Sequence, residues 1–343
     1  MVKVAVAGFG YWGPNLVRTF NNLENCELIA CCDRDTARLI AVRERYPGIY
    51  VTTSYEEILE SRDVDAVVIA TPARSHYEMV HSALLSGKHV LVEKPLAMNS
   101  TGAEDLINVA KGAGLVLMVG HTFLYSPAVH VLKGIVQSGE LGSITHLYSQ
   151  RLNLGRIQTD INAMWSLAPH DVSIVLHLLN KDPVMVAATG GCYLTPGIED
   201  VVFLTMTFPD GVIANVHVSW LDWSKVREFA VIGSRQMVEY DDTALDDKIR
   251  VYDRRAERSS NSTGPFHLHS GEIQVPNVPF TEPLANECGD FIRCIADGEW
   301  PISDGSNGLK VVRVLEAAQY SLKNHGAPVE LVSGTGATSL VIA

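Results

Sequence analysis

The first third of the chain alternates short apolar runs with segments whose apolar residues recur at helical spacing. The apolar runs cover residues 2–7, 27–32, 65–70, 88–92 and 115–119, without alternating polar positions. Strands with this pattern are covered on both faces, as in a parallel sheet with helices on either side. The pattern therefore predicts an α/β unit with a doubly wound parallel sheet of the Rossmann type.

Beyond residue 120 the pattern changes to strands joined by short turns, together with helices at 126–138 and 166–180. The predicted strands cover residues 144–154, 184–193, 199–208, 211–220, 226–232 and 235–240. Turn signals such as Pro209-Asp210-Gly211 separate them. This succession indicates an α+β domain with a large, mainly antiparallel open sheet.

The last part of the chain is more polar. Residues 253–281 are rich in Ser, Pro and Asn, and we interpret them as a long loop or flap. Helices are predicted at 284–297 and 306–324, and the tail from Ser333 is expected to be extended or frayed. The predicted domains are 1–122 and 123–343, and the C-terminal helices are able to pack back on the first domain.

Composition narrows the range of partners. The chain has 343 residues, 47% of them apolar and 19% charged, and its formal net charge is −12. This acidic balance argues against a nucleic-acid surface, although a local Arg or Lys cluster can still hold a small anion. The longest apolar stretches are strand-sized, so we expect no membrane span.

The six cysteines indicate free thiols rather than a metal site. None forms a CxxC pair, and Cys31 and Cys32 fall in a predicted buried strand. His267 and His269 are interpreted as solvated, because no further ligands cluster near them, so we expect no metal. Val2 already belongs to the first strand and no signal peptide precedes it, so we expect a cytoplasmic protein.

The first apolar run opens straight into a glycine-rich turn, Gly8-Phe9-Gly10-Tyr11-Trp12-Gly13. Gly8 allows the tight turn, Gly10 lets a pyrophosphate approach the backbone, and Gly13 lets the next helix lie close to the strand. The unpaired N–H groups at the start of that helix favour a diphosphate. All six residues of the turn are candidate cofactor contacts.

An acid follows at the spacing that a dinucleotide site needs. Asp33 ends the second apolar run, 20 residues after Gly13 (33 − 13), where a carboxylate can accept both hydroxyls of an adenosine ribose. The expected cofactor is therefore NAD. NADP is the lesser expectation, because Asp33 repels a 2′-phosphate, although Arg34 beside it can tolerate one.

Two further motifs follow strands of the predicted parallel sheet, on its ligand side. Thr71-Pro72 comes after the third run, and His76 is close behind it. These residues are candidate cofactor contacts. The structural alternative is a strand-to-helix turn with Thr71 as the cap, Pro72 at the first helical position and His76 as a buried residue.

Glu93-Lys94-Pro95 ends the fourth run. An oxidised nicotinamide and partial burial both lower the pKa of a lysine, which suits Lys94 for taking a proton from an alcohol. Glu93 is a candidate contact for the nicotinamide ribose, and Pro95 favours an extended geometry at Lys94. The alternative is a salt-bridging pair at a surface loop.

The helix predicted at 166–180 carries the last candidates. His170 follows Pro169 early in that helix and can face a substrate hydroxyl, or it can simply cap or pack. Trp165, just before the helix, can stack near the nicotinamide or pack at the domain junction.

Together these motifs resemble the glucose–fructose oxidoreductase / inositol dehydrogenase / rhizopine-catabolism family. The resemblance covers essentially the whole chain, adds Gly120-His121 as a further match, and its most specific part is Glu93-Lys94-Pro95. It implies an NAD-dependent oxidoreductase in which Lys94 is the acid/base and the second-domain sheet forms a homodimer or homotetramer. Many members carry Asp one turn before the histidine that matches His170; here that residue is Ser166.

Within the family, the residues after Gly120 resemble the branch that acts on nucleotide-linked sugars, as do 150–155 and 165–171. That resemblance implies oxidation of C3 of a sugar such as UDP-N-acetylglucosamine. The candidate substrate contacts are Lys94, Tyr125, Arg151, Asn153, Arg156 and His170. Arg151 and Arg156 can grip a diphosphate by forked hydrogen bonds, or form surface or interface salt bridges.

Other functions remain open at this stage. The family resemblance also admits a free cyclitol or aldose dehydrogenase, or a 3-ketosugar reductase, on the same scaffold. A non-catalytic NAD-binding sensor or structural subunit is the alternative from another class, and the intact Glu93-Lys94-Pro95 argues against it.

Overall fold

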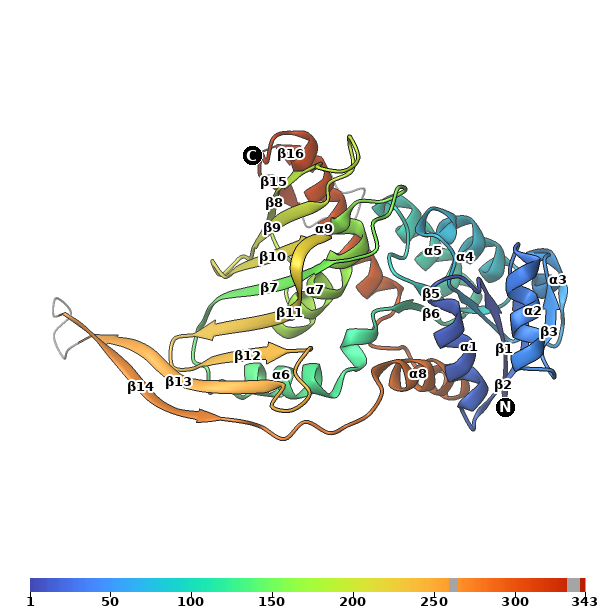
Figure 1. The fold of residues 1–343 in the computed structure, drawn as a ribbon, viewed down its shortest axis with the longest axis horizontal. Coiled ribbons are helices and arrows are strands. Elements are labelled where there is room, and N and C mark those ends of the chain that lie inside the picture. The colour runs from blue at the N-terminus through green and yellow to red at the C-terminus, as the bar shows by residue number, and fades with distance from the viewer. Residues whose placement is uncertain (259–264, 332–339, 343) are drawn as a thin grey trace. The chain divides into compact units, whose positions relative to one another are not determined.

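The computed structural model describes residues 1–258, 265–331 and 340–342 (Figure 1). The chain forms two compact units, which are described separately. Unit 1 contains Met1–Tyr125 and Thr281–Arg313, and unit 2 contains Ser126–Phe280 and the chain from Val314 onward. Unit 1 is therefore built from two stretches that are far apart in the sequence.

The sheet of unit 1 has six parallel strands in the order β3-β2-β1-β4-β5-β6. The strands are β1 (Val2–Ala7), β2 (Cys26–Cys32), β3 (Tyr50–Thr52), β4 (Ala66–Ile69), β5 (His89–Glu93) and β6 (Leu117–Gly120). The predicted Rossmann sheet is confirmed, with the short β3 as an additional strand. The strand order reverses between β1 and β4, where such sheets bind their ligands.

The helices of unit 1 are amphipathic and cover the buried strands. They are α1 (Gly13–Asn22), α2 (Thr36–Arg45), α3 (Tyr55–Glu60), η1 (Ala73–Ser75), α4 (His76–Leu85), α5 (Ser100–Ala113), η2 (Thr122–Tyr125), α8 (Pro283–Asp297) and the first part of α9 (Gly305–Lys323). Helix α8 closes the same core as β1 and α1, since Phe291 packs edge-to-face on Phe20, with ring centroids 6.5 Å apart.

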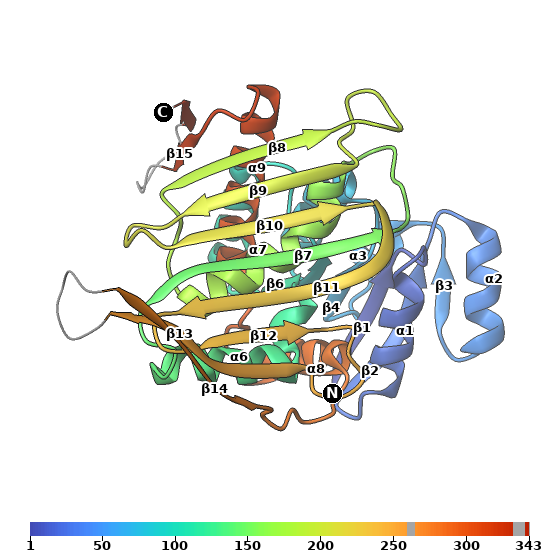
Figure 2. The same ribbon diagram turned by 60° about the vertical axis from the view of Figure 1, so that its left-hand side comes forward.

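Unit 2 contains a ten-stranded sheet in the order β14-β13-β12-β11-β7-β10-β9-β8-β15-β16 (Figure 2). The strands are β7 (Ile144–Leu154), β8 (Met185–Gly191), β9 (Val201–Thr207), β10 (Ile213–Ser219), β11 (Leu221–Gly233), β12 (Met237–Asp241), β13 (Ile249–Arg258), β14 (Phe266–Gln274), β15 (Val329–Leu331) and β16 (Leu340–Ile342). Among the described strands of this sheet only β7 and β10 pair in parallel, so the predicted mainly antiparallel sheet is confirmed.

Two helices of unit 2 follow the sequence pattern. Helix α6 (Pro127–Ser138) lies where it was predicted, whereas α7 (Ala163–Leu179) begins three residues earlier than expected. The reason is a cap: the Asn162 side chain accepts a hydrogen bond from the Trp165 backbone N–H at 3.0 Å.

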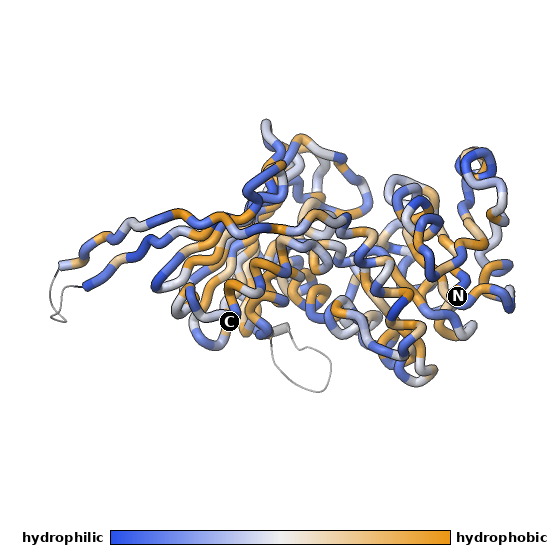
Figure 3. Tube along the Cα trace, turned by 90° about the horizontal axis from the view of Figure 1, so that it is seen from below, coloured by the Kyte–Doolittle hydropathy of each residue, from blue (hydrophilic) through white to orange (hydrophobic). Residues whose placement is uncertain are grey.

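The predicted loop at 253–281 is wrong over most of its length. Strands β13 and β14 form an antiparallel hairpin that extends from the sheet (Figures 1 and 2). Only one residue of β14 is less than exposed, so β14 has no buried face, and β13 is buried only near its start, at Ile249 and Val251. Figure 3 shows mainly hydrophilic residues along it. The tail that was expected to fray from Ser333 lies mostly outside the described residues.

Candidate functional site

The turn between β1 and α1 needs its glycines for space as well as conformation. Gly8 has φ +101°, and a Cβ there would lie 2.7 Å from the Ala70 carbonyl oxygen. At Gly13 a Cβ would lie 2.1 Å from the Gly8 carbonyl oxygen. At Gly10 the nearest atom to a Cβ would be Arg38 Nη1 at 3.6 Å, so the turn is open there. The geometry fits the expected approach of a pyrophosphate to Gly10.

The N-terminus of α1 lacks a side-chain cap. Its N-cap residue is Trp12, which makes no capping hydrogen bond, and Pro14 occupies the first turn. The first N–H groups of a helix have no partner within the helix, and they carry the positive end of its dipole. This end of α1 is therefore suited to a diphosphate. Tyr11 in the preceding turn is 76% exposed.

Asp33 lies directly after β2, buried against the glycine-rich turn. Its Oδ2 accepts a hydrogen bond from the Phe9 backbone N–H at 2.6 Å, and its Oδ1 accepts one from the Asp35 backbone N–H at 2.8 Å. The arginine beside its carboxylate is Arg38 of α2, with Nη1 3.3 Å from Oδ2, whereas Arg34 is exposed. Arg34 was predicted as a cofactor contact because it follows Asp33 in the chain. The structure places Arg38, in the first turn of α2, beside the Asp33 carboxylate.

His76 links two loops at the carboxyl edge of the sheet. Its Nδ1 lies 2.7 Å from the Pro95 carbonyl oxygen and its Nε2 lies 2.9 Å from the Thr71 carbonyl oxygen. Burial lowers the pKa of His76, and a neutral imidazole donates only one N–H. These contacts favour the structural interpretation of His76. The helical turn η1 also begins one residue later than expected, with Pro72 as its N-cap.

The side chain of Thr71 has partners within the same loop. Its hydroxyl donates to Met79 Sδ at 3.3 Å and accepts a hydrogen bond from the Ser75 hydroxyl at 2.9 Å. Thr71 is therefore not the helix cap that the structural alternative predicted. It remains a candidate cofactor contact at the end of β4.

Lys94 follows the last residue of β5, and the Lys94–Pro95 peptide bond is cis. Burial raises the pKa of Glu93 to about 7, while Lys94 and the Trp12 indole act in the opposite direction. His121 follows β6, the neighbouring strand. Burial, and then the charge of Lys94, lowers the pKa of His121 to about 3, so its imidazole is neutral.

His121 is 1% exposed, and neither of its ring nitrogens has a hydrogen-bond partner within the described part of the chain. Buried polar groups in folded proteins are nearly always paired, so an exception needs an explanation. A ligand that contacts the edge of β5 and β6 would supply one. The predicted contacts Glu93, Lys94 and His121 thus lie together at the ends of two adjacent strands.

Sequence reasoning missed Glu287, a fully buried carboxyl group on α8. Its Oε2 accepts a hydrogen bond from the Thr122 hydroxyl at 2.8 Å, one residue after His121. A signal was present: Glu287 takes a core position in the stripe formed by Leu284, Cys288 and Phe291. A charged residue in such a stripe is rarely buried without a reason.

In unit 2 the predicted substrate contact Arg151 pairs with Asp171, the residue that follows His170 in the sequence. The Arg151 guanidinium donates two hydrogen bonds to Asp171, from Nε to Oδ2 at 2.7 Å and from Nη2 to Oδ1 at 3.1 Å. Both side chains are less than one-tenth exposed. This bidentate pair favours a structural role for Arg151.

Trp165 belongs to the buried framework around the start of α7. Its indole N–H donates to Gln319 Oε1 at 3.1 Å, and Gln319 also accepts from Asn162 Nδ2 at 2.9 Å. Ser166 accepts a hydrogen bond from Gln158 Nε2 at 2.7 Å. His170 lies one turn further along α7, where it is partly buried.

The remaining predicted substrate contacts differ in accessibility. Tyr125 is buried in unit 1, with its hydroxyl 3.2 Å from Ser303 Oγ, and burial raises its pKa. Asn153 is half-buried near the end of β7, and Arg156 is exposed just beyond it. The contacts of Tyr125 are those of a core residue.

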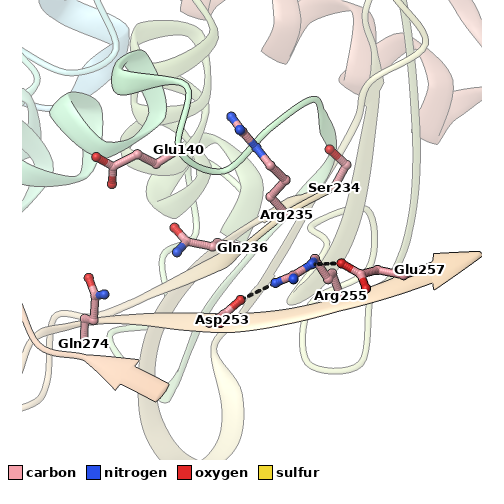
Figure 4. Close-up of a pocket in the computed structure, with 8 residues that line it drawn as sticks. All are labelled: Glu140, Ser234, Arg235, Gln236, Asp253, Arg255, Glu257 and Gln274. Atoms are coloured by element: carbon pink, nitrogen blue, oxygen red, sulfur yellow. Dashed lines mark hydrogen bonds and ion pairs between the residues drawn. The ribbon is translucent and has the colours of Figure 1, made fainter. Parts of the chain in front are cut away.

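A surface hollow of about 730 Å³ in unit 2 contains none of the predicted site residues (Figure 4). Arg255 lies there between Asp253 and Glu257, with which it forms ion pairs. The two carboxylates therefore more than offset the charge of the guanidinium. The hollow is lined by Glu140, Ser234, Arg235, Gln236, Asp253, Arg255, Glu257 and Gln274.

Across the described ranges no three His, Cys, Asp or Glu side chains gather as a metal site would require. His269 instead faces Asp253, at 2.8 Å. None of the helices in these ranges is both long and apolar enough to span a membrane.

The residues of unit 1 fit a nicotinamide dinucleotide. The turn at Gly10 has no Cβ in the way, α1 offers uncapped N–H groups, and Asp33 lies beside both. At the ends of β5 and β6, His121 has ring nitrogens that nothing else engages in the described residues. Candidate contacts for each part of the cofactor thus follow β1, β2, β4, β5 and β6.

Comparisons with known proteins agree with this geometry. The family description "Oxidoreductase family, NAD-binding Rossmann fold" matches residues 2–121, and the GFO/IDH/MocA C-terminal domain matches residues 129–239. A UDP-N-acetylglucosamine 3-dehydrogenase from Acidithiobacillus ferrooxidans is 28% identical over 261 residues, covering 73% of this chain and 76% of the relative.

A dTDP-3,4-didehydro-2,6-dideoxy-alpha-D-glucose 3-reductase from Streptomyces antibioticus is 30% identical over 285 residues, covering 79% of this chain and 81% of the relative. The crystal structure of a putative oxidoreductase from Magnetospirillum magnetotacticum is 30% identical, with a TM-score of 0.80. It covers 92% of this chain and 99% of that one. The protein is an NAD-binding oxidoreductase, a member of the GFO/IDH/MocA family.

Proposed function

We propose that the protein oxidises a secondary alcohol of a nucleotide-linked sugar to a ketone, with Lys94 as the acid/base. The observation that carries the proposal is the position of Lys94 next to His121, at the end of a strand in the sheet that binds NAD. Relatives named as a UDP-N-acetylglucosamine 3-dehydrogenase and a dTDP-sugar 3-reductase support the substrate class.

The chemistry divides between cofactor and protein. NAD⁺, when bound, supplies the acceptor for the hydride that leaves the carbinol carbon. The proposed role of Lys94 Nζ is to take the hydroxyl proton, so that the alcohol loses one proton and one hydride and becomes a ketone. The neutral imidazole of His121 can hydrogen-bond a ligand group without adding a second positive charge beside Lys94.

His170 has a separate proposed role as a second acid/base or orienting group. Asp171, which follows His170 in the sequence, is bound to Arg151. Arg156 and Asn153 remain proposed substrate contacts. Arg151, whose guanidinium is bound to Asp171, is the weaker candidate for a diphosphate.

The experiment is a turnover assay with NAD⁺ and a panel of free and nucleotide-linked sugars. We expect reduction of NAD⁺ with a nucleotide sugar, inhibited by UDP, and a loss of about 10²–10⁴-fold in kcat for Lys94→Ala. Lys111→Ala, on the exposed face of α5, is the matched control and should keep full activity. Turnover of a free cyclitol without inhibition by UDP would overturn the substrate class.

The relative from Streptomyces antibioticus is named as a reductase, which favours a second candidate function on the same site, reduction of a 3-ketosugar. Offering NADH with the ketone tests it, since Lys94 would then return its proton to the forming alkoxide. We further propose a homo-oligomer in the cytoplasm. All six cysteines are free thiols, which supports a reducing compartment. Size-exclusion chromatography with light scattering tests self-association.

A further inference from the structure

Two carboxyl groups lie near the turn that follows β6. Glu93 pairs with Gly120 across β5 and β6, and a Cβ on Gly120 would lie 3.2 Å from the Glu93 carboxyl carbon. The Glu93 carboxyl therefore folds over the Gly120 backbone. Two residues further on, the Thr122 hydroxyl donates to Glu287 Oε2. Both carboxyl groups thus contact one short segment, residues 120–122.

Glu287 has the surroundings of a neutral acid. The residue is 0% exposed, and its Oε1 has no hydrogen-bond partner among the described residues. Within the same ranges, no lysine or arginine forms an ion pair with it. An ionised carboxylate in such a place lacks the partners that would repay its lost hydration, so the group retains its proton.

Electrostatics agrees with this geometry. Burial raises the pKa of Glu287 well above its ordinary value, and the charge of Glu93 raises it further, while the Thr122 hydroxyl opposes the shift. The pKa of Glu93 is about 7. Glu93 therefore ionises first, and its charge holds the proton on Glu287. The other titratable groups that face the pair are Lys94, His121, Tyr125 and Cys288.

We propose that Glu93 and Glu287 form a buried carboxyl pair that carries at most one negative charge at neutral pH, with Glu287 as its neutral member. Glu287 is then a positioning residue: through Thr122 and Glu93 it joins α8 to the strand end that carries Lys94. Ionisation of Glu287 would place a second, unpaired charge in this core and loosen that strand end. Only the effect on Lys94 rests on the proposed function.

Infrared titration of the carboxyl C=O band tests the pair without any substrate. Wild type should show a step near pH 7 and a second step at higher pH. Glu287→Gln should remove only the higher step. Glu93→Gln should lower the Glu287 step by about one pH unit or more, because the repelling charge is gone. An unchanged Glu287 step in Glu93→Gln would overturn the pair.

Glu282→Gln is the matched control, because it removes an exposed carboxylate at the start of the same helix and should leave both steps in place. The positioning role is read from the pH profile of kcat/KM. Glu287→Gln should match wild type near neutral pH and extend the alkaline limb by about one pH unit.

The two hypotheses fail separately. If the carboxyl steps are coupled but no sugar is oxidised or ketone reduced, the proposed function fails and the pair stands. If turnover depends on Lys94 but the alkaline limb of Glu287→Gln coincides with that of wild type, the positioning role fails.

Discussion

Two groups of buried polar side chains, one in each unit, are built in opposite ways. In unit 2, Arg151 and Asp171 bind each other through two hydrogen bonds. In unit 1, within the described residues, His121 has no partner for either ring nitrogen and Glu287 has none for Oε1. Each unpaired buried group costs about 1–3 kcal/mol. The contrast indicates that the first group holds the fold together, whereas in the second group His121 is available to a ligand and Glu287 stays neutral.

The largest effect on stability is expected when the pair between Arg151 and Asp171 is broken. Arg151→Met leaves the Asp171 carboxylate buried and unpaired, so the free energy of unfolding should fall by about 3–5 kcal/mol in urea denaturation. The double variant Arg151→Met with Asp171→Leu should recover most of that loss. A double variant as unstable as the single one would show that the pair is not what Arg151 stabilises.

The next effect concerns the pH dependence of stability. Glu93 loses its proton near 4.5 when unfolded and near 7 when folded, so stability that is present below the first value is lost as the pH rises through the second. In Glu93→Gln the free energy of unfolding should therefore fall by roughly 3 kcal/mol less than in wild type as the pH rises through this range. Unfolding measured at several values between about pH 4 and about pH 8 checks it, and an equal slope in both proteins would contradict it.

Asp33 tests the other end of the cofactor site. Asp33→Ala removes the acceptor for the ribose hydroxyls and leaves the Arg38 guanidinium with Asp35 as its ion-pair partner. NAD⁺ affinity should fall by about 2 kcal/mol, roughly 30-fold, while NADP⁺ binding improves relative to it. Adding Arg38→Ala should abolish that relative gain. Calorimetric titration measures both affinities, and a loss shared equally by both cofactors would argue against the assignment.

The smallest loss of stability is expected at His121, whose ring nitrogens have no hydrogen-bond partner within the described residues. His121→Phe removes no hydrogen bond within the described residues, so the free energy of unfolding should not fall by more than about 1 kcal/mol. The affinity for NADH, followed by fluorescence, should nevertheless fall several-fold. Loss of stability without loss of affinity would place His121 with the structural group.

The features that could be predicted from the sequence are those that depend on residues close together in the chain. The buried strands of unit 1 appear as apolar runs, and the turn from Gly8 to Gly13 is fixed by contacts within a few residues. The hairpin β13–β14 was missed because β14 has no buried face and β13 is buried only near its start, so neither strand carries a sustained period-two hydrophobic pattern.

Residues of the candidate site could be predicted only where a local motif, such as the end of a strand, marks them in the sequence. Glu93, Lys94 and His121 were found because each follows a strand of a recognisable sheet. The pairing of Arg151 with Asp171 joins a strand to a helix, and the bond between Thr122 and Glu287 spans 165 residues. Such partners depend on tertiary packing, which periodicity does not encode.

The order of the chain delays the folding of unit 1. Its first stretch ends at Tyr125, and its second begins 156 residues later, at Thr281 (281 − 125). Protein synthesis at about 5–20 residues per second makes this a wait of roughly 10–30 s. During that time Phe20 lacks its aromatic neighbour Phe291. A nascent chain stalled before Thr281 should therefore expose part of the nucleotide-binding core and be a substrate for chaperones.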